Sequence, residues 1–68
     1  MSVTILEGLA NAEMNIENGL MLGPVVLNLA MSQLRNARIL LEKGYGVEEE
    51  VEPLLEKFGS VEDVPEKN

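Results

Sequence analysis

The chemistry open to this 68-residue chain is limited first by the side chains that it lacks. It contains no cysteine and no histidine, so no thiol or imidazole can act as a nucleophile, a general base or a metal ligand. The absence of cysteine also excludes a disulfide framework. The serine, lysine and tyrosine side chains that remain have no imidazole to activate them. We therefore expect a protein that is not an enzyme, with no catalytic residue, no cofactor and no metal ion.

Carboxylate groups are the remaining candidates for metal chemistry, and their spacing does not favour it. Glu13 and Glu17 lie one helical turn apart, but di-metal helical bundles complete such pairs with histidine. The glutamates within 48–52 lack the alternate ligand spacing and the central glycine of a calcium-binding loop. Both groups are interpreted as solvated acidic surface.

The negative charge is concentrated in the last third of the chain. Residues 1–43 carry four glutamates against three basic residues, whereas residues 44–68 carry eight carboxylates against Lys57 and Lys67, a net charge of −6. Such a block repels phosphates, which argues against direct nucleic-acid binding. It either keeps the protein soluble or binds a protein with a basic surface. The candidate contact residues for such a partner are Tyr45, Glu48, Glu49 and Glu50.

These side chains must be positioned by helices, and the first is predicted from about Thr4 to Asn18 or Leu22. Thr4 and Glu7 fit a capping box, and apolar residues then recur at steps of three and four, which is helical periodicity. Gly19 or Gly23 can supply the left-handed stop. Three asparagines share the opposite face, which is interpreted as solvent-facing rather than as a polar contact strip. They are Asn11, Asn15 and Asn18.

A second helix is predicted from Pro24 to Lys43, with Gly44 following its end. Its apolar arc spans about 160° and is centred on Ala30 and Ala37, which is wider than one neighbouring helix needs. The first helix can cover only part of this arc, so either the third segment or a second copy of the chain must cover the rest, and we expect the second copy. The predicted interface residues are Val26, Leu27, Leu29, Ala30, Gln33, Leu34, Ala37, Leu40 and Leu41.

Gln33 is the one polar side chain that points into this arc. Two interpretations stay open. It either pairs with its counterpart in a second copy and so fixes the register, or it lies at the rim and reaches water.

The acidic third segment has two possible forms because Pro53 disfavours helix at the residue before it. One is a kinked helix over 47–58, and the other is a turn followed by a short helix from Pro53. Gly59 ends either form. Residues 1–59 are therefore predicted to form a single small helical domain, and residues 60–68 a frayed tail.

The predicted fold class is all-α: a helical hairpin plus a short acidic third helix, dimerising into a four-helix-type bundle. Association is expected because a core of this size rarely stabilises a chain alone. The longest apolar stretch, residues 20–31, is too short to span a bilayer, and no signal peptide is visible, so no membrane contact and a cytoplasmic location are expected. The sequence favours a small non-enzymatic interaction or regulatory module acting as a homodimer. The alternative is an acidic accessory subunit or inhibitor of a larger, nucleic-acid-processing enzyme.

Overall fold

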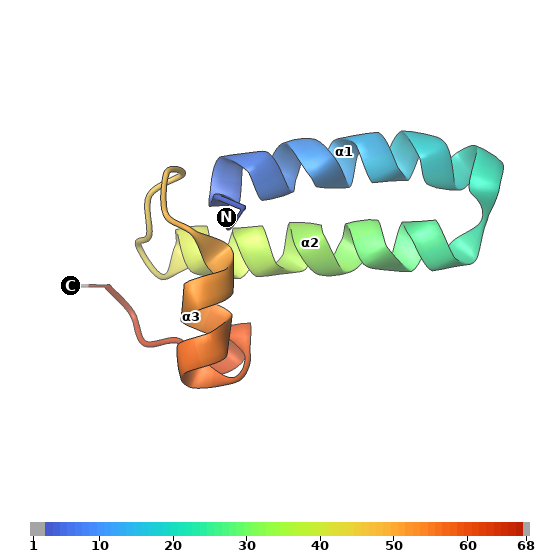
Figure 1. Ribbon diagram of the computed structural model, residues 1–68. Coiled ribbons are helices and arrows are strands. Elements are labelled where there is room, and N and C mark those ends of the chain that lie inside the picture. Colours follow the sequence, from blue (N-terminus) through green and yellow to red (C-terminus); the bar gives the residue numbers. More distant parts are fainter. Residues whose placement is uncertain (1–2, 68) are drawn as a thin grey trace.

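The computed structural model describes residues 3–67, which form three α-helices and one short 3-10 helix. Helices α1 (Ile5–Leu22) and α2 (Pro24–Glu42) lie antiparallel as a hairpin (Figure 1). Helix α3 (Val51–Phe58) crosses the hairpin near the C-terminal end of α2, and the 3-10 helix η1 (Val61–Asp63) follows it. The predicted all-α class and the predicted helical hairpin are confirmed.

The start of α1 is held by its own capping box and by a distant loop. Thr4 Oγ1 accepts from the Glu7 amide at 3.2 Å, and the Glu7 carboxylate accepts from the Thr4 amide at 3.1 Å, as the sequence predicts. The next two amides of the helix, beginning with that of Ile5, donate to the carbonyl oxygens of Glu49 and Val47 at 2.9 Å. The first turn of α1 therefore has acceptors for its free amides, and the loop at 47–50 is fixed against it.

A single residue, Gly23, joins the two long helices. Its φ of 113° is one that L side chains rarely adopt, and its amide donates to the Gly19 carbonyl at 2.9 Å. Pro24 begins α2 at the position where its missing N–H costs nothing. At the other end of α2, Gly44 has a φ of 96°. Of the two glycines predicted as possible stops of the first helix, Gly23 is the one that ends it and Gly19 lies inside it, and the predicted stop at Gly44 is confirmed.

Helix α3 resembles the second of its two predicted forms, with a different starting point. A turn covers 47–50, and the helix begins at Val51 rather than at Pro53. Pro53 is the third helical residue, where an amide would have no acceptor within the helix. The proline therefore interrupts no hydrogen bond and produces no kinked long helix.

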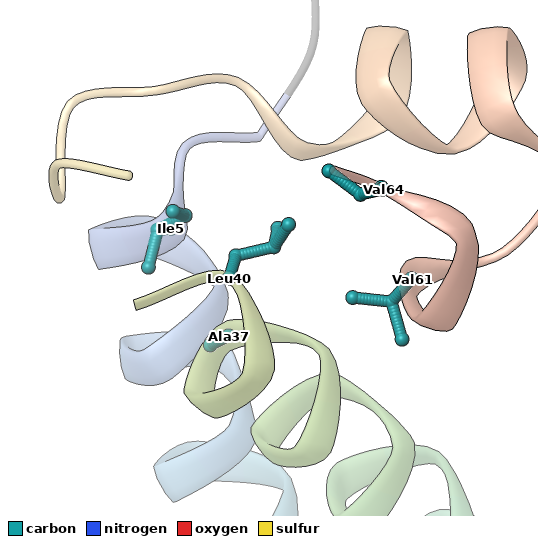
Figure 2. Close-up of a cluster of buried hydrophobic side chains, with 5 residues drawn as sticks. All are labelled: Ile5, Ala37, Leu40, Val61 and Val64. Carbon is teal, nitrogen blue, oxygen red and sulfur yellow. The ribbon is translucent and has the colours of Figure 1, made fainter. Parts of the chain in front are cut away.

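The core lies at the base of the hairpin, which is the end away from Gly23. It consists of Ile5 from α1, Ala37 and Leu40 from α2, and two valines that follow α3, Val61 and Val64 (Figure 2). Half-buried side chains surround it: Leu9, Ile39, Tyr45, Val51, Leu54, Leu55 and Phe58. The part of the hairpin nearest the turn has no third layer over it (Figure 1).

Residues 60–68 were expected to form a frayed tail, but residues 60–67 contact the rest of the chain. Val61 and Val64 are each only 2% exposed. The Lys43 ammonium donates to the carbonyl oxygens of both valines and of the residue after Val61. The Tyr45 hydroxyl donates to the Pro65 carbonyl at 2.9 Å. These long-range contacts make the segment part of the core. Residue 68 lies outside the described residues.

Candidate interaction surface

Small residues let the two long helices approach each other closely. Gly8, Ala12 and Gly19 are the buried middle of α1, and they face Ala30 and Ala37 of α2. The groove that the sequence analysis assigned to a second copy is therefore occupied by α1 of the same chain. Ala30, Ala37 and Leu40 are at most 1% exposed, so these three predicted interface residues cannot contact a partner.

The two edges of the hairpin differ in chemistry. Successive residues of a helix are rotated by about 100°, which assigns each residue to one face. On this basis one edge of the hairpin carries the asparagines of α1 and two amide-bearing residues of α2, and we call it the amide flank. Its members are Asn11, Asn15, Asn18, Gln33 and Asn36. Asn15 Nδ2 donates to Gln33 Oε1 at 2.9 Å. Gln33 thus bonds to α1 of its own chain, which neither of its two interpretations predicted, and Asn15 acts as a polar contact.

The opposite edge, which we call the leucine flank, carries three apolar residues from each helix. They are Leu9, Ile16 and Leu20 of α1 and Leu27, Leu34 and Leu41 of α2. Leu20 is 79% exposed, Leu34 is 43% exposed, and Ile16 and Leu41 are each 37% exposed. The seven-residue steps on α2 are typical of a helix seam that meets another helix. The described part of the chain leaves this seam open to solvent.

The predicted interface residues do not form one surface. Leu27, Leu34 and Leu41 share the leucine flank, whereas Val26, Leu29 and Gln33 lie on the side of the amide flank. The apolar residues that α1 contributes to the leucine flank were not among the predicted interface residues. They are Leu9, Ile16 and Leu20, whose helical spacing was visible in the sequence. A second signal was available, because small residues recur next to these positions and mark the true contact.

Two opposite charges lie on the leucine flank. Glu13 lies on α1 between Leu9 and Ile16, and Arg38 lies on α2 between Leu34 and Leu41. Both side chains are exposed. Among residues 3–67, neither makes an ion pair with its own chain, whereas Arg35 pairs with Glu62 and Lys67 pairs with Glu49. These two charges are therefore available to a partner.

The loop predicted to contact a partner also makes contacts within the chain. Tyr45 is half-buried, its hydroxyl bonds to the last described segment, and the Lys67 ammonium lies 5.5 Å from the centre of its ring. The Glu49 carboxylate pairs with Lys67. Glu48 and Glu50 are exposed. Of the four predicted contact residues, two therefore stabilise the position of the C-terminal segment.

The pKa shifts in the structure have local causes at helix and segment ends. Hydrogen bonds from the amide and the hydroxyl of Thr4 lower the pKa of Glu7. The hydrogen bond to the Glu49 carboxylate raises the pKa of Lys67. Both groups are near the surface, and each shift is explained by a structural contact. Within residues 3–67 no cluster of three or more carboxylates is placed to hold a metal ion.

No helix among the described residues combines the length and the apolarity that crossing a membrane requires.

No family model, no curated protein and no solved structure matches this chain.

Proposed function

We propose that this protein is a small, non-enzymatic protein–protein interaction module that acts as a homodimer through its leucine flank. The observation that carries this proposal is the exposure of Ile16, Leu20, Leu34 and Leu41 along one edge of the hairpin. Contiguous apolar surface on a small protein marks an interaction site. When the leucine flanks of two copies pack against each other, the four helices make a four-helix bundle, in which each apolar seam is covered.

The size of the core supports the same conclusion. The buried cluster at the hairpin base contains five apolar residues, and among the described residues only Ala12 and Ala30 are further buried apolar residues. A domain of this length without disulfides commonly needs association for stability. Dimerisation would add a second apolar core along the length of the hairpin, where the chain alone has only the contact between α1 and α2.

Sedimentation equilibrium of the wild-type chain and of Leu34→Glu tests this proposal. The wild type should sediment as a dimer. Leu34→Glu should be a monomer with an unchanged helical circular dichroism spectrum, because this side chain is already 43% exposed in the single chain. Met21→Glu is the matched control, since Met21 is 87% exposed but lies at the turn, outside the leucine flank. A monomeric wild type at every concentration would refute the proposal.

The acidic accessory subunit or inhibitor is the second candidate function, and one observation favours it. The turn and helices after Gly44 all gather at the hairpin base (Figure 1), so the carboxylates of this segment form one acidic end. Glu48, Glu50, Glu52 and Glu56 are exposed there. Such an end suits the basic surface of a nucleic-acid enzyme.

An arginine-rich peptide serves as the probe for this second function. Titrated into isotopically labelled protein, it should shift the amide resonances of residues 48–56 at low salt, and high salt should reverse the shifts. Shifts confined to α1 would argue against an acidic docking end.

A further inference from the structure

The two charges on the leucine flank are placed where a second copy would meet them. Measured as rotation about each helix, at about 100° per residue, Glu13 and Arg38 both point within roughly 20° of straight out from this flank. Each lies between two leucine-flank residues of its own helix, which are three or four positions away. The other residues one turn away are Ala10 and Glu17 for Glu13, and Arg35 and Glu42 for Arg38. The leucine flank itself therefore carries one negative and one positive position, and further charged residues border it.

The register of the hairpin fixes how far apart these positions lie along its axis. Asn15 is level with Gln33, since their side chains bond at 2.9 Å, and Gly19 is level with Leu27, which it contacts closely. It follows that Glu13 is level with Leu34. Glu13 is also near the middle of α1, which runs from Ile5 to Leu22.

Two symmetric arrangements can place one leucine flank on another. If the two-fold axis is perpendicular to the helices, α1 packs on α1 of the second copy, and full overlap sets Glu13 opposite Glu13 because both are at mid-helix. Like charges opposed in an apolar contact cost several kcal/mol. If the axis is parallel to the helices, α1 packs on α2 of the second copy, and the two turns lie at the same end.

The parallel axis pairs the opposite charges. Glu13 then faces the second copy's α2 at the level of Leu34, four residues from Arg38 of that copy, which is about 6 Å along the axis. Side chains tilt toward the N-terminus of their own helix. Glu13 therefore leans toward the hairpin base and Arg38 leans toward the turn, so the two side chains lean toward each other.

We infer that the second copy binds the leucine flank with α1 of each copy against α2 of the other, and with Glu13 of each copy paired to Arg38 of the other. This inference rests on the proposed homodimer and adds its orientation and its charge pairing. The interface is isologous, so one bundle contains two such ion pairs.

Mixing two charge variants tests the pairing. Glu13→Arg alone and Arg38→Glu alone each place two like-charged pairs in the homodimer, and each should raise the dimer dissociation constant about a hundredfold or more. An equimolar mixture of the two variants should form a heterodimer of nearly wild-type affinity, because each contact then regains one carboxylate and one guanidinium. Both residues are exposed in the single chain, so circular dichroism should show both variants folded.

The possible results separate this inference from the proposed function. A wild type that is a monomer overturns both. A wild-type dimer whose affinity neither variant changes overturns the pairing alone. Preferential assembly of Glu13→Arg with the wild type, rather than with Arg38→Glu, overturns the pairing in favour of Glu13 opposed to Glu13.

A distance measurement reports the orientation independently of charge. The chain has no cysteine, so Met21→Cys gives one spin-label position at the turn, on a residue that is 87% exposed. With the turns at the same end, the two α1 helices lie diagonally in the bundle, so the labelled backbone positions should be about 11–14 Å apart, given helix spacings of about 8–10 Å. With Glu13 opposed to Glu13, Met21 of each copy lies eight residues from the two-fold axis, so the labelled backbone positions should be about 24 Å apart or more, and such a value would overturn the inferred orientation.

Discussion

Two glycines of α1 show how the same residue type can serve opposite purposes. Gly8 and Gly19 are both buried on the face toward α2. A Cβ at Gly8 would meet nothing within 4 Å, whereas a Cβ at Gly19 would lie 2.7 Å from the Leu27 side chain and 3.2 Å from its backbone nitrogen. Gly19 is therefore required for the close approach of the helices near the turn. Gly8 borders a small hollow of about 150 Å³.

The two glycine-to-alanine variants should consequently change stability in opposite directions. Gly8→Ala should raise the free energy of unfolding by about 0.5–1 kcal/mol, because alanine restricts the unfolded chain and enters open space. Gly19→Ala should lower it by about 1–3 kcal/mol through overpacking. Urea denaturation at one fixed protein concentration measures both. If Gly19→Ala were as stable as the wild type, the helices would not be in such close contact at Leu27.

The capping carboxylate of α1 predicts a pH dependence. Because hydrogen bonds from Thr4 lower the pKa of Glu7 in the folded chain below 4.5, its contribution to stability is complete above that value. The contribution is lost as pH falls through the lowered pKa. The stability advantage of the wild type over Glu7→Gln should thus be constant near neutral pH and shrink below about pH 4.5. Urea denaturation across pH checks this, and Glu17→Gln controls for the loss of one exposed charge.

The residues that the sequence revealed most clearly are those whose signal is local. The capping box at Thr4 and the helix start at Pro24 depend on neighbours within four residues, so the pattern alone identifies them. The sequence identified Ala30 and Ala37 as the centre of an apolar arc, but it did not identify the element that covers them. That information lies in α1, and no local pattern chooses between a helix of the same chain and one of a second copy.

At the scale of elements, the largest difference between expectation and structure is the segment after α3. Two valines three residues apart among polar neighbours are a weak pattern, and Pro65 favours an irregular chain end. Their burial depends on Lys43, which is 18 or more residues earlier, and on Leu40 of α2. Candidate site residues were missed for the same reason. Which edge of the hairpin stays open depends on where α3 and η1 pack.

Lys43→Met should loosen this C-terminal segment selectively. The substitution removes an ammonium that donates to the carbonyls of Val61 and Glu62 at 2.9 Å, and hydrogen bonds to charged groups contribute about 1.5–3 kcal/mol. Hydrogen exchange at the amides of Asp63 and Val64 should become faster, while exchange in the middle of α2 stays slow. Lys57→Met is the control, because the Lys57 ammonium only lies over the Phe58 ring at 5.3 Å. Equal effects of the two variants would contradict the anchoring role.

At the scale of the whole molecule, the hairpin separates two kinds of surface. The acidic segment packs around the base, and the leucine flank runs along one edge toward the turn. In the inferred dimer the two bases lie at the same end, so two segments that each carry a net charge of −6 become neighbours. The ion pairs between Glu13 and Arg38 oppose this repulsion locally. Because these pairs lie among apolar side chains, salt screens them less than it screens the exposed acidic ends.

This geometry predicts that the dimer becomes tighter as salt is added. The Debye length is about 30 Å at 0.01 M salt and about 8 Å at 0.15 M, so the repulsion between the two acidic ends should be strong at the lower concentration and nearly absent at the higher one. The dissociation constant from sedimentation should therefore fall over this range. Glu52→Gln combined with Glu56→Gln, at two exposed positions of α3, should tighten the dimer at low salt and flatten its salt dependence. A dimer that salt weakens throughout this range would instead place the acidic ends far apart, because only the ion pairs would then respond to screening.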